Sequence, residues 1–210
     1  TVWPLPISAY TTNAPVCQEG VISFTDQSVP NVGTLTGWQW NFNDPTSGAN
    51  NTSTLQNPTH FFANPGSYTV SLTVTTSNGC VSLNTLPALV VHPKPEAGYI
   101  IPEVCLSDTY AQFTDTSRVA TPSTITAWSW NFGDANATPP ANPNTSTLQN
   151  PQHSYTAVGS YQVSLIVTSN QGCKDTIVQQ MFVSASNPQA NFSVNQPALL
   201  CANDSVRITD

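Results

Sequence analysis

The sequence predicts an all-β protein made of tandem immunoglobulin-like β-sandwiches arranged head to tail. Three observations lead to this prediction: few helix-forming residues, an internal repeat, and apolar residues that alternate with polar ones. The 210-residue chain contains 18 prolines, 10 glycines and one methionine, and only 7% of its residues are charged. Because β-branched and aromatic residues are common while Lys and Glu are scarce, strands are favoured over helices.

An internal repeat divides the chain. The octapeptide Asn-Thr-Ser-Thr-Leu-Gln-Asn-Pro occurs at 51–58 and again at 144–151, and other segments recur in the same order. These segments are 38–42 and 128–132, 66–72 and 159–165, and 79–80 and 172–173. A repeat of this kind indicates structural units that follow one another along the chain.

The repeat predicts the domain organisation. Residues 4–93 and 94–188 are each expected to form a whole sandwich. Residues 1–3 are expected to finish a preceding repeat, and residues 189–210 to supply the first strands of a truncated third repeat. The proline-containing junction at 93–95 should limit bending between the two sandwiches.

The strands and the core are expected from the side-chain pattern. In the first repeat, Tyr68, Val70, Leu72 and Val74 share one face of a strand, and Ser and Thr occupy the other face. This alternation predicts a strand with one buried face, and each repeat is expected to contain about seven such strands. Gly-Ser-Tyr at 66–68 predicts a tyrosine corner, in which the phenol bonds upstream backbone. The predicted core comprises Trp38, Trp40, Phe42, Tyr68, Trp128, Trp130, Phe132 and Tyr161.

Three ordered motifs of the second repeat are similar to those of a known family. They are Trp-x-Trp-Asn-Phe-Gly-Asp at 128–134, Asn-Pro-x-His-x-Tyr at 150–155, and Gly-x-Tyr-x-Val-x-Leu-x-Val at 159–167. Together with their counterparts in the first repeat, these residues resemble the PKD (polycystic kidney disease) domain. The first repeat differs at Asn43, where the family favours glycine, but asparagine tolerates the left-handed backbone of a sharp turn.

The resemblance implies a secreted bacterial protein located outside the cell or at its surface, with no catalytic activity of its own. It implies a structural or adhesive segment of an extracellular filament or giant cell-surface adhesin. The alternative is a spacer or carbohydrate-binding accessory module of a secreted hydrolase. The partners expected are neighbouring repeats of the same chain, other copies in a fibre, or surface glycans.

Acidic and histidine residues supply the candidate chemistry. Calcium binds to some relatives of the family, and Asp44 and Asp134 are the candidate ligands here. Because Ca²⁺ needs six to eight oxygen ligands and few other carboxylates are near, we expect both residues to cap turns instead. His60 and His153 match each other and are expected to pack in the core and bond a loop carbonyl. No other cofactor is predicted.

The five cysteines suggest disulfide bonds. We expect Cys17 at the end of its sandwich where the chain leaves, and Cys80 at the end where the chain arrives. The strand between these ends spans about 30 Å, whereas a disulfide joins Cα atoms at most about 7 Å apart. Head-to-tail stacking therefore predicts an inter-domain bond between Cys17 and Cys173.

The other cysteines follow from the same stacking. Cys80 is expected to bond with the previous repeat, Cys105 with the next repeat and Cys201 with a fourth, all of them outside these 210 residues. Pairing within each repeat (Cys17–Cys80 and Cys105–Cys173) and free thiols remain the alternatives.

Candidate modification sites lie on polar segments. Thr176 and Ser205 stand in Asp-Thr-Ile and Asp-Ser-Val, which resemble the O-glycosylation signal of the bacteria that carry such PKD repeats. Asn51 and Asn144 stand in Asn-x-Ser/Thr sequences, which are acceptors for N-glycosylation.

Charge and hydropathy exclude two classes of partner. The chain has only 4 Lys and Arg residues against 11 Asp and Glu residues, so it cannot neutralise a run of phosphates and should not bind nucleic acid. It has no apolar run of roughly 18 residues, so membrane insertion is not expected.

Overall fold

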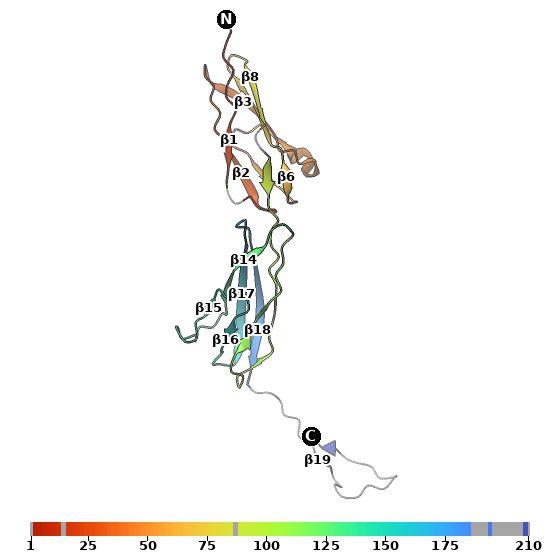
Figure 1. Cartoon of the computed structure of the whole chain (residues 1–210), viewed down its shortest axis with the longest axis vertical. Coiled ribbons are helices and arrows are strands. Elements are labelled where there is room, and N and C mark those ends of the chain that lie inside the picture. The colour runs from red at the N-terminus through yellow and green to blue at the C-terminus, as the bar shows by residue number, and fades with distance from the viewer. Residues whose placement is uncertain (1, 14–15, 86–87, 186–192, 195–207, 210) are drawn as a thin grey trace, which may run out of the picture.

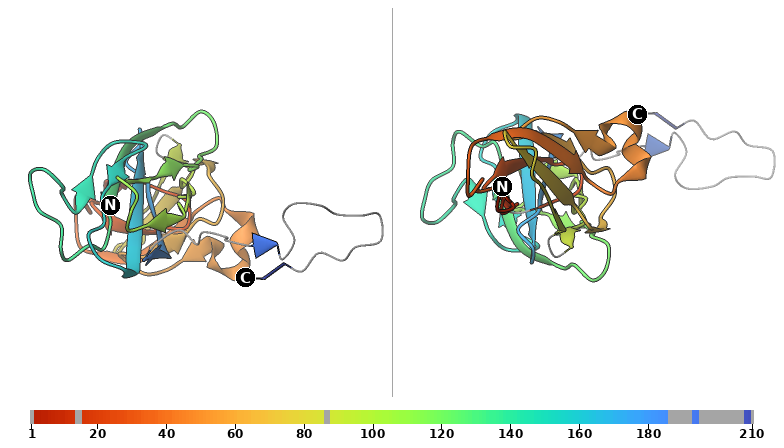
Figure 2. Two further views of the ribbon diagram at one scale, coloured as in Figure 1. Left: turned by 90° about the horizontal axis from the view of Figure 1, so that it is seen from below. Right: turned by 90° about the horizontal axis from the view of Figure 1, so that it is seen from above.

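The computed structural model describes residues 2–13, 16–85, 88–185, 193–194 and 208–209, and strands dominate these residues. Two β-sandwiches follow one another along the long axis of the molecule (Figure 1). Viewed along that axis, from below or from above, the two sandwiches overlap (Figure 2). The predicted all-β, head-to-tail architecture is therefore confirmed.

The first sandwich has two layers of antiparallel strands. Its elements are β1 (Tyr10–Thr12), β2 (Val21–Asp26), β3 (Leu35–Asn41), the 3-10 segment η1 (Pro45–Asn51), β4 (Thr52–Ser53), β5 (Thr59–Phe61), β6 (Gly66–Tyr68), β7 (Ser71–Thr76), β8 (Val81–Thr85) and β9 (Leu89–Val91). One sheet has the strand order β4-β3-β7-β8, and another has the order β1-β2-β5. Strand β6 pairs with β9.

The second sandwich repeats this arrangement. Its strands are β10 (Tyr99–Ile100), β11 (Val104–Cys105), β12 (Ala111–Gln112), β13 (Thr114–Asp115), β14 (Ile125–Asn131), β15 (Thr145–Ser146), β16 (Gln152–His153), β17 (Gly159–Ser169) and β18 (Lys174–Ser184). The larger sheet has the order β11-β18-β17-β14-β15, and β10–β13 and β12–β16 form separate pairs. Strand β11 runs parallel to β18, whereas the other strand pairs of this sandwich are antiparallel.

Each sandwich has its own core. The first core includes Trp40 and Phe42 of the tryptophan motif together with Val70, Leu72 and Val74, all of them at most 1% exposed. A separate cluster in the second sandwich contains the predicted residues Trp130, Phe132 and Tyr161. The alternation around β7 therefore buries the face that the sequence pattern predicts.

The prediction that Trp38 and Trp128 belong to the buried core is wrong, because both side chains are only partly buried. Their rings pack against the core, but each indole N–H reaches a carboxylate at the end of a strand that belongs to another sheet. Trp38 Nε1 donates to Asp26 Oδ2 at 2.7 Å, and Trp128 Nε1 donates to Asp115 Oδ2 at 2.8 Å. A tryptophan ring with one polar atom is satisfied in this way at the border of a core.

Both sandwiches contain the predicted tyrosine corner. The Tyr68 hydroxyl donates to the backbone carbonyl of Asn64 at 2.8 Å, and the Tyr161 hydroxyl donates to that of Ala157 at 2.7 Å. Tyr161 is buried, but Tyr68 is only partly buried, which is the third correction to the predicted core.

The turn after the tryptophan strand has the left-handed backbone that the sequence predicts. Asn43 has φ 55° and Gly133 has φ 67°. A Cβ atom at Gly133 would lie 2.5 Å from the backbone oxygen of Gln162, so the second sandwich requires glycine at this position. The first sandwich tolerates asparagine there because asparagine adopts this conformation at little cost.

Part of the predicted third repeat lies within the described residues. Ser193–Val194 (β19) pairs in antiparallel fashion with Ile208–Thr209 (β20). Strands β10 and β13 pair in the same sense at the start of the second sandwich. The other residues of 189–210, including Cys201 and Ser205, lie outside the described residues. Within the part that is described, no helix has the length and apolar character needed to cross a membrane.

Candidate functional site

The junction between the two sandwiches is covalent. Cys17 and Cys173 form a disulfide with an S–S distance of 2.03 Å and a Cα–Cα distance of 5.7 Å. Cys17 lies beside His92 at the end of the first sandwich, and Cys173 lies in the turn between β17 and β18. The structure thus contains the inter-domain bond expected from head-to-tail stacking, and neither Cys17–Cys80 nor Cys105–Cys173 forms.

A lysine between the sandwiches bonds to both of them. Lys94 Nζ lies 3.1 Å from Asp175 Oδ1 in the second sandwich and 3.5 Å from Glu19 Oε2 in the first. The hydrogen bond to Asp175 raises the pKa of Lys94, and the charge of Glu19 adds to this effect. Burial alone would raise the pKa of Asp175, but hydrogen bonds from the Ala97 backbone and Lys94 outweigh it and lower that pKa.

Backbone bonds and a small apolar cleft complete the junction. The Gln18 N–H donates to the His92 carbonyl at 2.8 Å, which ties the cysteine-bearing loop to the last residues of the first sandwich. A cleft of about 330 Å³ is also lined by residues of both sandwiches. These residues include Pro65, Val90 and Pro93 from the first sandwich and Pro122 and Gln171 from the second.

The sequence predicts the disulfide, but this ion-pair network was not predicted. Glu19 and Asp175 are far apart in sequence, and only the stacked arrangement brings them to the same lysine. A signal was present, however, because Lys94 is one of only 4 basic residues and stands between two prolines in the predicted junction.

A buried carboxylate–imidazole pair recurs in both sandwiches. His60 Nε2 lies 3.1 Å from Asp44 Oδ2, and His153 Nε2 lies 3.0 Å from Asp134 Oδ2. All four side chains are at most 4% exposed. The expectation that these histidines bond loop carbonyls is therefore wrong, because each bonds the aspartate that ends the tryptophan motif.

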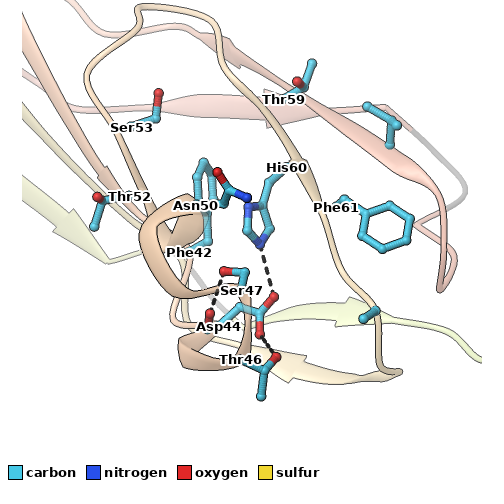
Figure 3. A pocket seen from close by; sticks show the side chains of 12 residues that line it. Phe42, Asp44, Thr46, Ser47, Asn50, Thr52, Ser53, Thr59, His60 and Phe61 are labelled. Carbon is cyan, nitrogen blue, oxygen red and sulfur yellow. Dashed lines mark hydrogen bonds and ion pairs between the residues drawn. The ribbon is translucent and has the colours of Figure 1, made fainter.

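Figure 3 shows this pair in the first sandwich at the wall of an open pocket of about 460 Å³. Asp44 accepts a hydrogen bond from Thr46 Oγ1 at 2.5 Å, as well as bonding His60. Ser47 Oγ donates to the Asp44 backbone carbonyl at 2.7 Å rather than to the imidazole. Both neighbouring hydroxyls therefore bond Asp44, one at its carboxylate and one at its backbone carbonyl.

Asp44 and Asp134, the candidate calcium ligands, lie in the turn that follows the tryptophan strand. Asp134 Oδ1 accepts the Asn136 backbone N–H at 2.9 Å, which is the turn-capping role expected for aspartate. Asp44 differs, because its Oδ1 accepts the side-chain hydroxyl of Thr46 and caps no backbone N–H of η1. Among the residues that the structure describes, no group of three or more His, Cys, Asp and Glu side chains is placed to hold a metal ion.

The predicted modification sites have different surroundings. Thr176 is exposed on β18, next to Asp175 of the junction. Asn51 Oδ1 accepts the Asp44 N–H at 2.6 Å, and Asn144 Oδ1 accepts the Asp134 N–H at 2.8 Å. The repeated octapeptide thus supplies an asparagine that holds the turn of the tryptophan motif, a structural role that the sequence analysis missed.

These features define a class of protein: tandem immunoglobulin-like sandwiches that carry tyrosine corners and are joined by a disulfide. The PKD domain model matches residues 3–89 and 92–183, and the chain belongs to the PKD domain family. Its repeats are therefore structural or accessory modules.

Solved structures of similar proteins include two PKD domains from Vibrio. The PKD1 domain of Vibrio anguillarum Epp is 25% identical, with 44% of this chain and 96% of that chain covered and a TM-score of 0.37. The PKD1 domain of the Vibrio cholerae metalloprotease PrtV is 30% identical, with 44% and 99% covered and a TM-score of 0.36. The fibronectin(III)-like modules of Clostridium thermocellum CbhA are 13% identical, with 87% and 100% covered and a TM-score of 0.41.

Proposed function

We propose that this chain is a load-bearing, non-catalytic segment of an extracellular filament or giant cell-surface adhesin. The observation that carries the proposal is the Cys17–Cys173 disulfide, which joins consecutive sandwiches instead of closing one of them. Structural disulfides persist in oxidising surroundings, which supports a location outside the cell. A bond between domains constrains their relative position, and that constraint matters most in a protein that transmits force.

The position of the disulfide determines which part of the chain carries tension. Force applied at the two ends of the chain reaches Cys17, crosses the sulfur atoms and continues from Cys173. The segment 18–172 then lies in a closed loop, which is shielded from the applied force while the bond is intact. Because the two cysteines are 156 positions apart, opening the bond would make roughly 500 Å of fully extended chain available.

The ion pairs of Lys94 support the same function. They connect the linker to the first sandwich through Glu19 and to the second through Asp175. Because Lys94 is 36% exposed, each pair contributes little to stability. Together with the disulfide, however, they resist rotation about the proline-containing linker.

Electron microscopy of the full-length native protein tests the proposed function. We expect extended rods or fibres in oxidising buffer and more strongly bent particles after the disulfides are reduced. Compact particles that show no response to reduction would contradict the proposal. Binding of this chain to insoluble cellulose or chitin would instead favour an accessory role in a secreted hydrolase.

A further inference from the structure

The N-terminal end of the first sandwich exposes an apolar surface around a cysteine. Cys80 Sγ lies in the segment between β7 and β8, 3.9 Å from the backbone carbonyl oxygen of Trp3. We call this surface the N-terminal face. It consists of Cys80 and five exposed apolar residues: Trp3 (45% exposed), Leu5 (62%), Ile7 (57%), Val29 (49%) and Val32 (37%).

Backbone contacts hold the N-terminal face together. Ile7 and Val29 form an antiparallel bridge with two N–O distances of 2.8 Å. The Asn31 side chain donates to the Leu5 carbonyl at 2.6 Å. Ser77, which precedes the cysteine turn, donates its N–H to the Thr34 carbonyl at 2.8 Å. The apolar side chains therefore project from connected backbone segments.

In the second sandwich, the residues that correspond to the N-terminal face form the junction with the first sandwich. The repeat places Cys173 where the first sandwich has Cys80, and Cys173 is bonded to a cysteine of the preceding sandwich. It also places His92 at the position that corresponds to Trp3 in the first repeat, and the His92 carbonyl accepts an N–H from the cysteine-bearing loop. Cys80 and the Trp3 carbonyl thus correspond to Cys173 and the His92 carbonyl, which both take part in the observed junction.

The two surfaces differ in chemistry. A Glu96–Arg118 bridge in the second sandwich corresponds to the Ile7–Val29 bridge in the first. Leu5 of the first repeat corresponds to Lys94 of the second repeat, which makes the ion pairs of the junction. The N-terminal face therefore keeps the backbone geometry of the junction but replaces its charges with apolar side chains.

We propose that the N-terminal face binds another PKD-type sandwich and that Cys80 forms a disulfide with the cysteine of that sandwich that corresponds to Cys17. This inference rests on the proposed function, and it specifies the partner. Forming the bond joins the two sulfur atoms, and the thiols pass two protons and two electrons to a disulfide oxidant, which is reduced to two thiols.

The proposed bond would interlock with the observed one. Cys80 lies between Cys17 and Cys173 in the sequence, so a bond from Cys80 to a preceding sandwich would close a second loop that overlaps the first.

Differential alkylation of the full-length native protein tests this inference. Thiols are blocked with one reagent, disulfides are then reduced and labelled with a second reagent, and peptides are identified by mass spectrometry. We expect Cys80 to carry the second label. In a non-reduced digest, we expect its peptide to be linked to a loop that carries a cysteine at the position of Cys17 in another PKD repeat. The inference is overturned if Cys80 carries the first label or is linked to a cysteine of another kind.

A matched pair of substitutions in the full-length protein tests the apolar contact. Leu5→Asp should lower the fraction of Cys80 that is disulfide-bonded, whereas Leu148→Asp, at a site 66% exposed in the second sandwich, should leave it unchanged. Equal effects of the two substitutions would contradict the role of the N-terminal face. The same digest also reports Cys17–Cys173: if that bond is found while Cys80 is free, this inference fails and the proposed function stands.

Discussion

His153 Nε2 lies 3.0 Å from Asp134 Oδ2 inside the second sandwich, where the two side chains are 1% and 0% exposed. The imidazole also stacks on Phe132, with ring centroids 4.4 Å apart. His153 Nδ1 is buried and has no hydrogen-bond partner. The carboxylate of Asp134 is therefore the polar group that holds this imidazole in place.

Replacing Asp134 should destabilise the second sandwich. Asp134→Ala leaves a buried imidazole unpaired, and we expect the free energy of unfolding to fall by about 3 kcal/mol. Hydrogen exchange of the β17 amides in urea measures this loss within one sandwich. Glu103→Ala, an exposed acidic position in the same sandwich, is the control and should change stability by less than about 0.5 kcal/mol. Equal effects would show that the pair does not stabilise the fold.

Asp26 should make the first sandwich sensitive to acid. Burial raises its pKa, but hydrogen bonds from Ser28, Trp38 and Gln56 outweigh burial, and the net pKa is lowered. A lowered folded-state pKa stabilises the fold above the unfolded value of about 3.9, and this stabilisation is lost as the pH falls through the folded-state pKa.

Urea unfolding of the wild type and Asp26→Asn across this acidic range checks the prediction. The wild type should lose more stability than the variant as the pH falls. Parallel pH profiles would mean that the Trp38–Asp26 bond does not favour the ionised carboxylate.

Tyr99 should make the second sandwich sensitive to alkali. Burial raises its pKa to about 12, and its hydroxyl donates to the Val163 carbonyl at 2.8 Å. The folded state keeps this proton to a higher pH than the unfolded state, whose tyrosine pKa is about 10. Stability should therefore fall as the pH rises from about 10 to 12.

The variant Tyr99→Phe separates ionisation from packing. At neutral pH it should lose about 1 kcal/mol, because the Val163 carbonyl loses its donor. Above about pH 10 its stability should decline less than that of the wild type. Some decline remains, since burial also raises the pKa of Tyr155. Identical alkaline profiles would show that Tyr99 ionisation does not limit stability.

The features that the sequence predicts correctly are those that a repeat or a period of two can encode. The tandem sandwiches, the tyrosine corners and the left-handed turn at Asn43 and Gly133 all belong to this group. The inter-domain disulfide also follows from the sequence, because strand order alone sets the ends at which Cys17 and Cys173 lie.

The remaining features depend on contacts between side chains from different strands. Trp38 matches Trp40 in the sequence pattern, but its indole N–H reaches Asp26 and leaves the ring partly exposed. Asp44 and His60 recur at matching places in both repeats, which hinted at a shared role. Their direct bond becomes evident only when β5, which carries His60, is placed beside the turn that carries Asp44.

The most direct test of load bearing is single-molecule stretching of this chain between its two termini. With the Cys17–Cys173 bond intact, we expect the extension on full unfolding to be shorter by roughly 500 Å than after reduction. Cys17→Ser should behave like the reduced chain under all conditions, whereas Cys80→Ser, outside the junction, should keep the difference. If oxidised and reduced chains extend by the same length, the disulfide does not shield the sandwiches and the account of a force-bearing junction is wrong.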